Sequence, residues 1–321
     1  MTTPALIALD WGTTSLRAYL LARDGAALDT RASSAGIMKL PAGGFDQAFE
    51  ETCGAWLDAH SHLPVIAAGM VGSAQGWIEA PYVDAPADAN ALVAGIVSVR
   101  TARGLDVRVV PGVLERGLLP NVMRGEETQI VGALASDASL SAKGGALIGL
   151  PGTHAKWAAV EAGRIERFYT FMTGEVFGAL RDHTILGRTM QQDAASDAAA
   201  FVRGVDTARD AGHPGVLATI FSTRTLGLTG QLAPAQQPDY LSGLLIGHEL
   251  RGLNEVLARD QSSLAGRTLR LIGNDALCDR YRAALARFGC NDAQTVAHAT
   301  ENGLYRIAAL AGLVPTPTRA P

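Results

Sequence analysis

The sequence predicts an α/β protein of about two domains. Short apolar stretches that suit buried strands alternate along the chain with longer stretches whose apolar residues recur at helical spacing. The chain has 321 residues, which corresponds to two domains at about 150 residues per domain. A pattern of strand, Gly-Thr turn and strand occurs near the start and again in the second half. Together these observations favour two related α/β halves.

The first half is expected to open with antiparallel strands. Gly12 suits a tight turn after the first apolar run, and Asp24-Gly25 is a strong signal for a hairpin turn. A glycine-rich loop, residues 69–77, follows a later apolar strand. We expect strands over residues 5–10, 15–22, 27–33, 63–68 and 107–110, and helices over residues 45–60 and 87–103.

Residues 111–121 are rich in proline and glycine and show little periodicity, so they suit a boundary between domains. We therefore predict one domain over residues 1–122 and another over residues 123–321. In the second, Asp275 is the expected cap of a helix. We expect its strands over residues 146–150, 155–160, 165–170, 268–272 and 294–297, and its helices over residues 239–259, 275–288 and 301–313.

Composition narrows the class of protein. The chain has 27 basic and 31 acidic residues, a net charge of −4, so it lacks the basic excess that general nucleic-acid binding requires. Its three cysteines are scattered, which fits a reducing compartment without disulfides. No basic segment precedes the first apolar run, and no apolar run is long enough to cross a membrane. These features favour a cytoplasmic enzyme with neither nucleic acid nor membrane as a partner, and a homodimer is compatible with them.

The stretch DWGTTSLR, which begins at Asp10, combines residues that suit a magnesium–phosphate site. A carboxylate at the end of a strand can hold hydrated Mg²⁺. Gly12 lets the backbone approach a phosphate, while Thr13 and Thr14 offer hydroxyl and N–H groups. Arg17 can add a guanidinium group, which donates two parallel hydrogen bonds to a phosphate. The alternative is an ordinary hairpin with a polar tip, and neither a P-loop nor a GxGxxG motif is present.

This hairpin and the later stretch PGTHAKW (residues 151–157) resemble the actin-like ATPase superfamily, which includes sugar kinases. The stretches GMVGSAQGW, MRGEETQIVGAL and FMTGEVF narrow the resemblance to the 2-dehydro-3-deoxygalactonokinases, over nearly the whole chain. The resemblance implies two ribonuclease-H-like domains with a nucleotide cleft between them. It also implies ATP-dependent phosphorylation of the terminal 6-hydroxyl of 2-dehydro-3-deoxy-D-galactonate, a step of galactonate degradation.

The resemblance implies that both Gly-Thr hairpins hold phosphates of ATP and that residues 271–281 lie near adenosine. Leu150 occupies the position that corresponds to Asp10, so Asp10 is the one hairpin acid expected to hold Mg²⁺. His154 and Lys156 could compensate as phosphate contacts, although a structural histidine and a solvated lysine are the alternatives. The implied ATP-binding residues are Gly12, Thr13, Thr14, Arg17, Gly152, Thr153, His154, Lys156, Gly273 and Asn274.

MRGEETQ occupies the place where related carbohydrate kinases carry their general base. Either Glu126 or Glu127 would take the proton of the acceptor hydroxyl, with Glu126 preferred. A pair of glutamates is also common at the start of an ordinary helix.

The loop GMVGSAQGW resembles the loop that lines the acceptor pocket of sugar kinases. Ser73 and Gln75 could bind hydroxyls, and Trp77 could cover a carbon chain or simply pack in the core. Arg124 is the candidate partner of the substrate carboxylate. Two other functions stay open: a kinase for another sugar, sugar acid or polyol, and an ATPase regulator without a small acceptor.

Overall fold

The computed structural model describes residues 3–141, 145–191, 193–210, 215–259 and 263–315. Its contacts group into two compact units. Unit 1 comprises Met1–Gly145, Ala159–Phe168 and Val296–Pro321, and unit 2 comprises Ala146–Ala158 and Tyr169–Thr295. These units are defined by contacts and not by chain order, so the domain boundary expected after residue 122 stays a prediction. Both units combine helices with strands, and the expected α/β class is confirmed.

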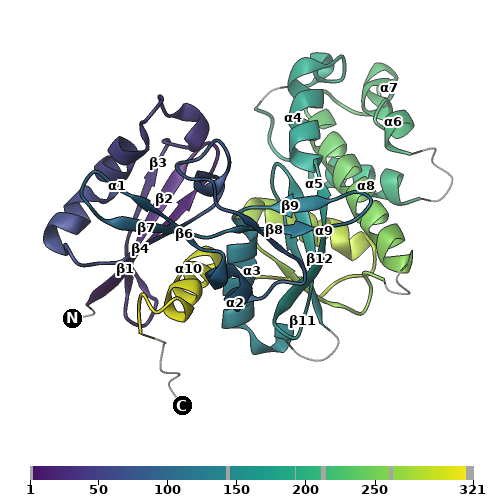
Figure 1. The fold of residues 1–321 in the computed structure, drawn as a ribbon. Coiled ribbons are helices and arrows are strands. Elements are labelled where there is room, and N and C mark those ends of the chain that lie inside the picture. Colours follow the sequence, from purple (N-terminus) through teal and green to yellow (C-terminus); the bar gives the residue numbers. More distant parts are fainter. Residues whose placement is uncertain (1–2, 142–144, 192, 211–214, 260–262, 316–321) are drawn as a thin grey trace. The chain divides into compact units, whose positions relative to one another are not determined.

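The first sheet has the strand order β3-β2-β1-β4-β7-β6 (Figure 1). β1 pairs antiparallel with β2 and parallel with β4, and β4 pairs parallel with β7. A small separate sheet has the order β5-β8-β9. The strands are β1 (Pro4–Trp11), β2 (Leu16–Ala22), β3 (Ala27–Ser33), β4 (Val65–Ala68), β5 (Tyr82–Asp84), β6 (Val97–Arg100), β7 (Asp106–Val109), β8 (Gly112–Glu115) and β9 (Asn121–Met123).

The sheet of the second half has the order β12-β11-β10-β13-β14. When the edge strand β6 is left out of the first sheet, both sheets have the same order: the third, second, first, fourth and fifth strands along the chain lie side by side. The repeat expected from the two Gly-Thr hairpins is therefore confirmed in the topology. Its strands are β10 (Ala146–Leu150), β11 (Ala155–Glu161), β12 (Arg164–Phe171), β13 (Thr268–Leu271) and β14 (Gln294–Thr295).

Helices flank the sheets, and within the described ranges none combines the length and apolar character needed to cross a bilayer. The α-helices are α1 (Phe45–Ala59), α2 (Ala89–Ala94), α3 (Glu126–Ser136), α4 (Thr173–His183), α5 (Ala198–Arg209), α6 (Val216–Thr219), α7 (Ser222–Leu228), α8 (Gln237–Arg259), α9 (Asp275–Arg287) and α10 (Ala299–Leu310). Single turns of 3₁₀ helix cover Ile37–Lys39, Met70–Gly72, Ala138–Ser141 and Gly187–Thr189.

Two local predictions were wrong. The helix expected over residues 87–103 is the short α2 followed by β6, because the chain turns at Gly95 and then pairs antiparallel with β7. The alternating burial of β6 is the pattern of a strand with one covered face. At α9 the cap is Asn274, whose side chain accepts a hydrogen bond from the N–H of Ala276, and Asp275 is the first helical residue.

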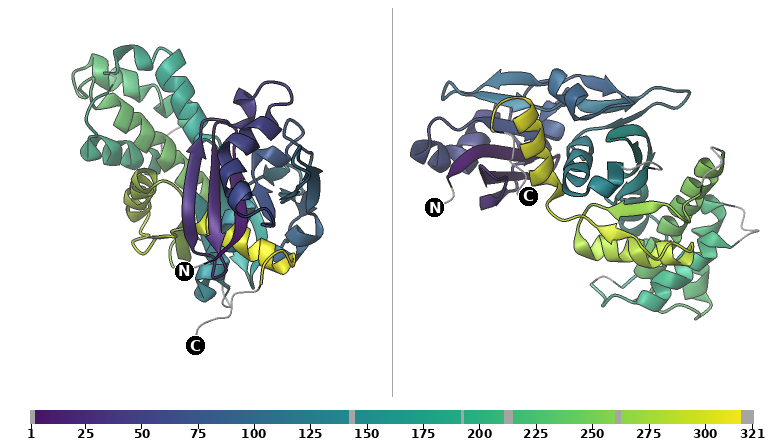
Figure 2. Two further views of the ribbon diagram at one scale, coloured as in Figure 1. Left: turned by 90° about the vertical axis from the view of Figure 1, so that its left-hand side faces the viewer. Right: turned by 90° about the horizontal axis from the view of Figure 1, so that it is seen from below.

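The alternation of side chains along β1 determines which residues face the core of unit 1. Ile7, Leu9 and Trp11 pack with α1 in one apolar cluster. Asp10 therefore belongs to the opposite face of the sheet. In Figure 2, α10 (yellow) runs along the purple strands on the side away from α1. β1 thus directs a carboxylate toward the side of the sheet that α10 covers.

Candidate active site

Asp10 lies near the carboxyl end of β1, directly opposite Arg17 on β2. The turn between the two strands is closed by a hydrogen bond from the Gly12 N–H to the Ser15 carbonyl oxygen at 2.9 Å. The N–H of Ile37 donates to the Gly12 carbonyl at 3.1 Å, so the segment that follows β3 also stabilises the turn. The side chains at the tip of the turn, Thr13 and Thr14, are exposed.

Two glycines bring the start of α3 close to the end of β1. Gly69 has φ +99°, and a Cβ there would lie 2.8 Å from the carbonyl oxygen of Trp11. Gly125 has φ +109°, and a Cβ there would lie 3.3 Å from the Cα of Gly69. Both positions need glycine, because an L side chain rarely adopts these angles and the space is filled by backbone. The close approach places the glutamates of α3 beside the carboxyl ends of β1 and β4.

Three carboxylates of unit 1 share one electrostatic neighbourhood. Burial raises the pKa of Asp10, the guanidinium of Arg17 opposes that shift, and the negative charges of Glu126 and Glu301 add to it. The sequence analysis named Asp10 and Glu126 as separate site residues and missed Glu301, which lies in the first turn of α10. No motif marks Glu301, and only the packing of α10 beside β1 brings it into range.

The two candidate bases, Glu126 and Glu127, have different surroundings in the structure. Glu127 is fully buried, and its carboxylate accepts hydrogen bonds from the N–H of Gly125 at 2.7 Å and the hydroxyl of Thr128 at 3.0 Å. Burial raises the pKa of Glu127 to about 8. Glu126 is only partly buried, and its Oε2 accepts a hydrogen bond from the N–H of Arg124 at 3.0 Å. Glu126 is thus the more accessible carboxylate.

Arg124 is buried against the glycine-rich loop and only 9% exposed. Its Nη2 donates to the carbonyl of Ala80 at 2.9 Å, and its guanidinium carbon lies 4.4 Å from the centre of the Tyr82 ring. A Cβ on Gly72 would lie 3.1 Å from Nη1. The Nε and Nη1 atoms are buried without a hydrogen-bond partner among the described residues. A buried cation with unused donors suits an anionic group.

The other residues expected in the acceptor pocket have different surroundings. The Oγ of Ser73 is buried and has no hydrogen-bond partner in the described part of the chain, whereas Gln75 is exposed. Trp77 is partly buried and packs in an aromatic cluster, stacked on Phe45 at 6.0 Å between ring centres and edge-on to Trp11 at 5.7 Å. That packing accounts for Trp77, and its contact with a substrate stays a prediction.

The second Gly-Thr hairpin lies in unit 2, between β10 and β11. Gly152 and Thr153 form its turn, and the N–H of Glu175 in α4 donates to the Thr153 carbonyl at 3.0 Å. The Nε2 of His154 is hydrogen-bonded to the carboxylate of Glu175, which ties the histidine to the first turn of α4. Lys156 is only 5% exposed, and its Nζ donates to the carbonyl of His154 at 3.4 Å. A solvated lysine is therefore excluded at this position.

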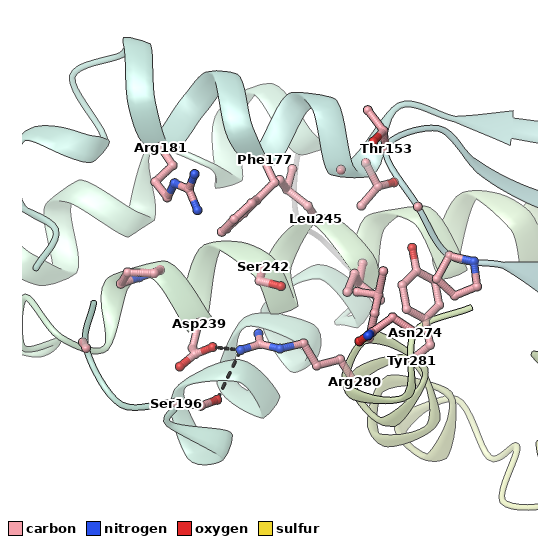
Figure 3. Close-up of a pocket in the computed structure, with 18 of the residues that line it drawn as sticks. Thr153, Phe177, Arg181, Ser196, Asp239, Ser242, Leu245, Asn274, Arg280 and Tyr281 are labelled. Carbon is pink, nitrogen blue, oxygen red and sulfur yellow. Dashed lines mark hydrogen bonds and ion pairs between the residues drawn. The ribbon is translucent and has the colours of Figure 1, made fainter. Parts of the chain in front are cut away.

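Unit 2 contains a pocket of about 750 Å³ that brings Gly152, Thr153 and Asn274 together. Figure 3 shows Thr153 and Asn274 at the end where Tyr281 also lies. Gly273 packs beside this end, since a Cβ there would lie 3.4 Å from the carbonyl of Pro151. Three of the expected ATP-binding residues thus line one cavity, which His154 and Lys156 do not line.

The other end of the pocket carries a charged pair that sequence reasoning missed. The guanidinium of Arg280 on α9 is paired with the carboxylate of Asp239 on α8 and hydrogen-bonded to the hydroxyl of Ser196 at 3.2 Å (Figure 3). Phe177 and Arg181 of α4 line this end as well. Asp239 falls in residues 239–259, for which the sequence predicted only a helix, and its pairing with Arg280 becomes visible when α8 is placed beside α9.

The described residues contain no group of three His, Cys, Asp or Glu side chains that would hold a metal ion by themselves. Leu150, at the position that corresponds to Asp10 in the second hairpin, is buried and apolar. Mg²⁺ does not require such a group, because it usually keeps several waters and binds through one or two carboxylates together with substrate phosphates. Asp10 and its acidic neighbours fit this pattern.

Comparison with known proteins places the chain in a family. The profile described as "2-keto-3-deoxy-galactonokinase" matches residues 10–307. The chain is 40% identical over 289 residues to a protein of Rhizobium meliloti (strain 1021) named as a probable 2-dehydro-3-deoxygalactonokinase, covering 88% of this chain and 90% of that protein. It is 34% identical over 293 residues to the 2-dehydro-3-deoxygalactonokinase of Escherichia coli (strain K12), covering 90% and 92%.

Solved structures agree on the fold. A Sinorhizobium meliloti protein assigned as a 2-dehydro-3-deoxygalactonokinase superposes with a TM-score of 0.84 at 36% identity, covering 97% of this chain and 100% of that one. The activator of the 2-hydroxyisocaproyl-CoA dehydratase from Clostridium difficile, at 13% identity and a TM-score of 0.50, covers 96% of each chain and shares the fold alone. The sequence match over nearly the whole chain and the shared fold lead to one conclusion: this chain belongs to the 2-keto-3-deoxy-galactonokinase family.

Proposed function

We propose that this chain is a kinase that transfers the γ-phosphoryl group of ATP to the terminal 6-hydroxyl of 2-dehydro-3-deoxy-D-galactonate, a step of galactonate degradation. The observation that carries the proposal is the family match over residues 10–307, together with curated relatives that bear this activity as their name. The arrangement of Asp10, Glu126 and Arg124 in unit 1 supports it, because these residues supply the charges that the reaction requires.

Both Gly-Thr hairpins are proposed to bind phosphates of ATP. Neither Gly12 nor Gly152 has a positive φ, and a Cβ on Gly152 would meet nothing within 4 Å in the described part of the chain. On Gly12 a Cβ would make only an ordinary contact, at 3.6 Å. Packing in the protein therefore does not require glycine at either turn, whereas close approach of a phosphate to the backbone does. Adenosine is assigned to the pocket of unit 2 that extends from Thr153 toward Arg280.

Asp10 is the residue proposed to hold Mg²⁺, with Glu126 and Glu301 adding negative charge beside it. When bound, the ion neutralises charge on the phosphates. Arg17, opposite Asp10, offers an exposed guanidinium for a phosphate oxygen.

Glu126 is proposed as the general base. The acceptor oxygen forms a bond to the γ-phosphorus, the bond from that phosphorus to the oxygen of the departing ADP breaks, and the hydroxyl proton passes to the Glu126 carboxylate. Glu126 suits this role better than Glu127, whose carboxyl is buried and engaged by Gly125 and Thr128. The unused donors of Arg124 would bind the carboxylate of the substrate, and Ser73 and Gln75 would bind its hydroxyls.

The cytoplasm is the proposed location, where ATP is available. Cys53, Cys278 and Cys290 are buried and free, as in most proteins of reducing compartments. A homodimer and the absence of nucleic-acid partners stay predictions.

A coupled ADP-release assay tests the proposed function. Purified protein with ATP and Mg²⁺ would be offered 2-dehydro-3-deoxygalactonate, its gluconate epimer, neutral hexoses and polyols. We expect the keto acid to be phosphorylated with the highest kcat/KM. Faster turnover of a neutral sugar would favour a different sugar kinase, and ATP hydrolysis that no acceptor accelerates would favour an ATPase regulator.

A further inference from the structure

A carboxyl group behind the pocket of unit 2 has three hydrogen-bond donors from three different elements. Glu249 lies on α8 and is only 3% exposed. Its Oε1 accepts a hydrogen bond from the indole Nε1 of Trp157 at 2.7 Å. Its Oε2 accepts from the hydroxyl of Tyr281 at 2.8 Å and also from the hydroxyl of Thr173.

Each donor belongs to a part of the protein that shapes the pocket. Thr173 is the first residue of α4 and Tyr281 lies on α9, and both line the cavity. Trp157 lies on β11, the strand that leaves the Gly-Thr turn. Glu249 itself does not line the cavity, so it acts on the pocket through its three partners.

The glycines next to Thr173 and Trp157 pack so closely that a movement of either partner would displace neighbouring backbone. A Cβ on Gly174, the residue after Thr173, would lie 2.5 Å from the carbonyl oxygen of Gly152 and 2.8 Å from the Cα of Thr153. A Cβ on Gly149 would lie 2.8 Å from the ring of Trp157. A shift of α4 therefore displaces the backbone of the Gly-Thr turn, and a shift of the indole ring displaces Gly149 in β10, the strand that leads into that turn.

All three donors are neutral groups, and the indole N–H can only donate. Oε1 must therefore be an acceptor whether the carboxyl is ionised or protonated. Burial raises the pKa of Glu249, while the hydrogen bonds from Thr173, Trp157 and Tyr281 oppose the shift. In either state Oε1 accepts from Trp157. Oε2 stays hydrogen-bonded to the two hydroxyls, as an acceptor from both when ionised and as a donor to one of them when protonated, so the carboxyl links three elements.

We propose that Glu249 is a positioning residue for nucleotide binding, which aligns the Gly152–Thr153 turn, the start of α4 and the Tyr281 face of α9 around the phosphate end of the pocket. This inference rests on the proposed function, since it takes a nucleotide as the ligand of that pocket. Its effect falls on ATP and not on the sugar acid, because Thr173 and Tyr281 line the unit 2 cavity and Trp157 lies on the strand that leaves the Gly-Thr turn of that cavity.

The test compares Glu249→Ala and Glu249→Gln with Leu257→Ala as a matched control. Leu257 lies on the same helix, is equally buried and does not line the pocket. Binding of ADP in the presence of Mg²⁺ is measured by calorimetry, together with thermal unfolding and the KM values for ATP and the keto acid.

We expect Glu249→Ala to weaken ADP binding at least tenfold and to raise the KM for ATP to match, with the KM for the keto acid within twofold of wild type. Glu249→Gln should stay within threefold, because the amide keeps an acceptor for Trp157 and offers a donor to the two hydroxyl oxygens. Leu257→Ala should lower thermal stability and leave ADP affinity unchanged.

Equal ADP affinity in Glu249→Ala and wild type would overturn the proposal, as would an equal loss in Leu257→Ala. If Glu249→Ala does not fold, Trp157→Phe carries the test: it removes one donor behind the pocket and should weaken ADP binding severalfold, and unchanged affinity would refute the proposal. The proposed function fails separately, when wild-type protein binds ADP but phosphorylates no sugar acid.

Discussion

Asp10 and Arg17 face each other across the antiparallel pair β1 and β2, so the carboxylate proposed to hold Mg²⁺ has a guanidinium as its direct cross-strand neighbour. The pair lies at the tip of the first hairpin, where Gly12 and Ser15 close the turn. Glu126 and Glu301 add negative charge from two helices. One basic and two acidic groups thus act on the charge of Asp10, next to a turn with exposed hydroxyls, and this arrangement suits a metal-bound phosphate.

Asp10→Asn is expected to lower kcat by about 100-fold or more while the protein stays folded, because the amide keeps the shape of the side chain but loses the charge that would hold Mg²⁺. The ADP-release assay and thermal unfolding measure the two effects. Glu51→Gln, on the exposed face of α1, is the control for loss of a carboxylate elsewhere. A near-normal kcat in Asp10→Asn would rule out the proposed metal role.

Glu126→Gln is expected to slow the chemical step by about 10²- to 10⁴-fold, the usual contribution of a general base, with the KM for ATP nearly unchanged. Glu127→Gln should keep most of the turnover, since its carboxyl is directed at Gly125 and Thr128. Single-turnover kinetics would separate chemistry from product release. If the chemical step is slowed in Glu127→Gln and not in Glu126→Gln, the base has been assigned to the wrong residue.

Glu127 should make the protein less stable as pH rises. Burial raises its pKa from the ordinary 4.5 to about 8, so the folded protein keeps a proton that the unfolded chain releases. The free energy of unfolding therefore falls between pH 4.5 and pH 8. Urea unfolding across this range should show a smaller decline in Glu127→Gln than in wild type. Parallel curves for the two proteins would mean that Glu127 is ionised in the folded state.

Arg124→Ala is expected to raise the KM for the keto acid by about tenfold or more and to leave the KM for ATP unchanged, because the Nε and Nη1 donors would pair with the substrate carboxylate. Arg124→Lys should recover only part of the loss, since an ammonium cannot reproduce the planar fork. Initial-rate kinetics with each substrate varied in turn provides the measurement. Equal changes in both KM values would reject Arg124 as the carboxylate partner.

Gly152→Ala should separate stability from nucleotide binding. The position has ordinary backbone angles and room for a methyl group, so the free energy of unfolding should be unchanged or rise by about 0.4–1 kcal/mol. The affinity for ADP should nevertheless fall about tenfold, because the methyl group occupies the space proposed for a phosphate. Denaturant unfolding and calorimetry would measure both. Wild-type affinity in a stable Gly152→Ala protein would argue against phosphate at this turn.

Much of the fold could be predicted because it depends on local pattern. The apolar runs of β1, β4 and β10 and the glycines in the turns that follow mark strands that end in loops, and the periodicity of α1 marks a helix. β6 could not be predicted, because its few residues read equally well as the end of a helix until β7 pairs with them. Propensity over short stretches is weak, and pairing decides between the alternatives.

The sequence by itself determined most strands of the two larger sheets and the position of the two Gly-Thr turns, since side-chain periodicity and turn preference act within a few residues. Only the tertiary structure decided that Glu301 lies near Asp10, that Glu127 is buried beside the accessible Glu126, and that Glu249 joins Trp157, Thr173 and Tyr281. Charge interaction, burial and hydrogen bonding depend on distance in space, and that distance is set when helices far along the chain pack against the sheets.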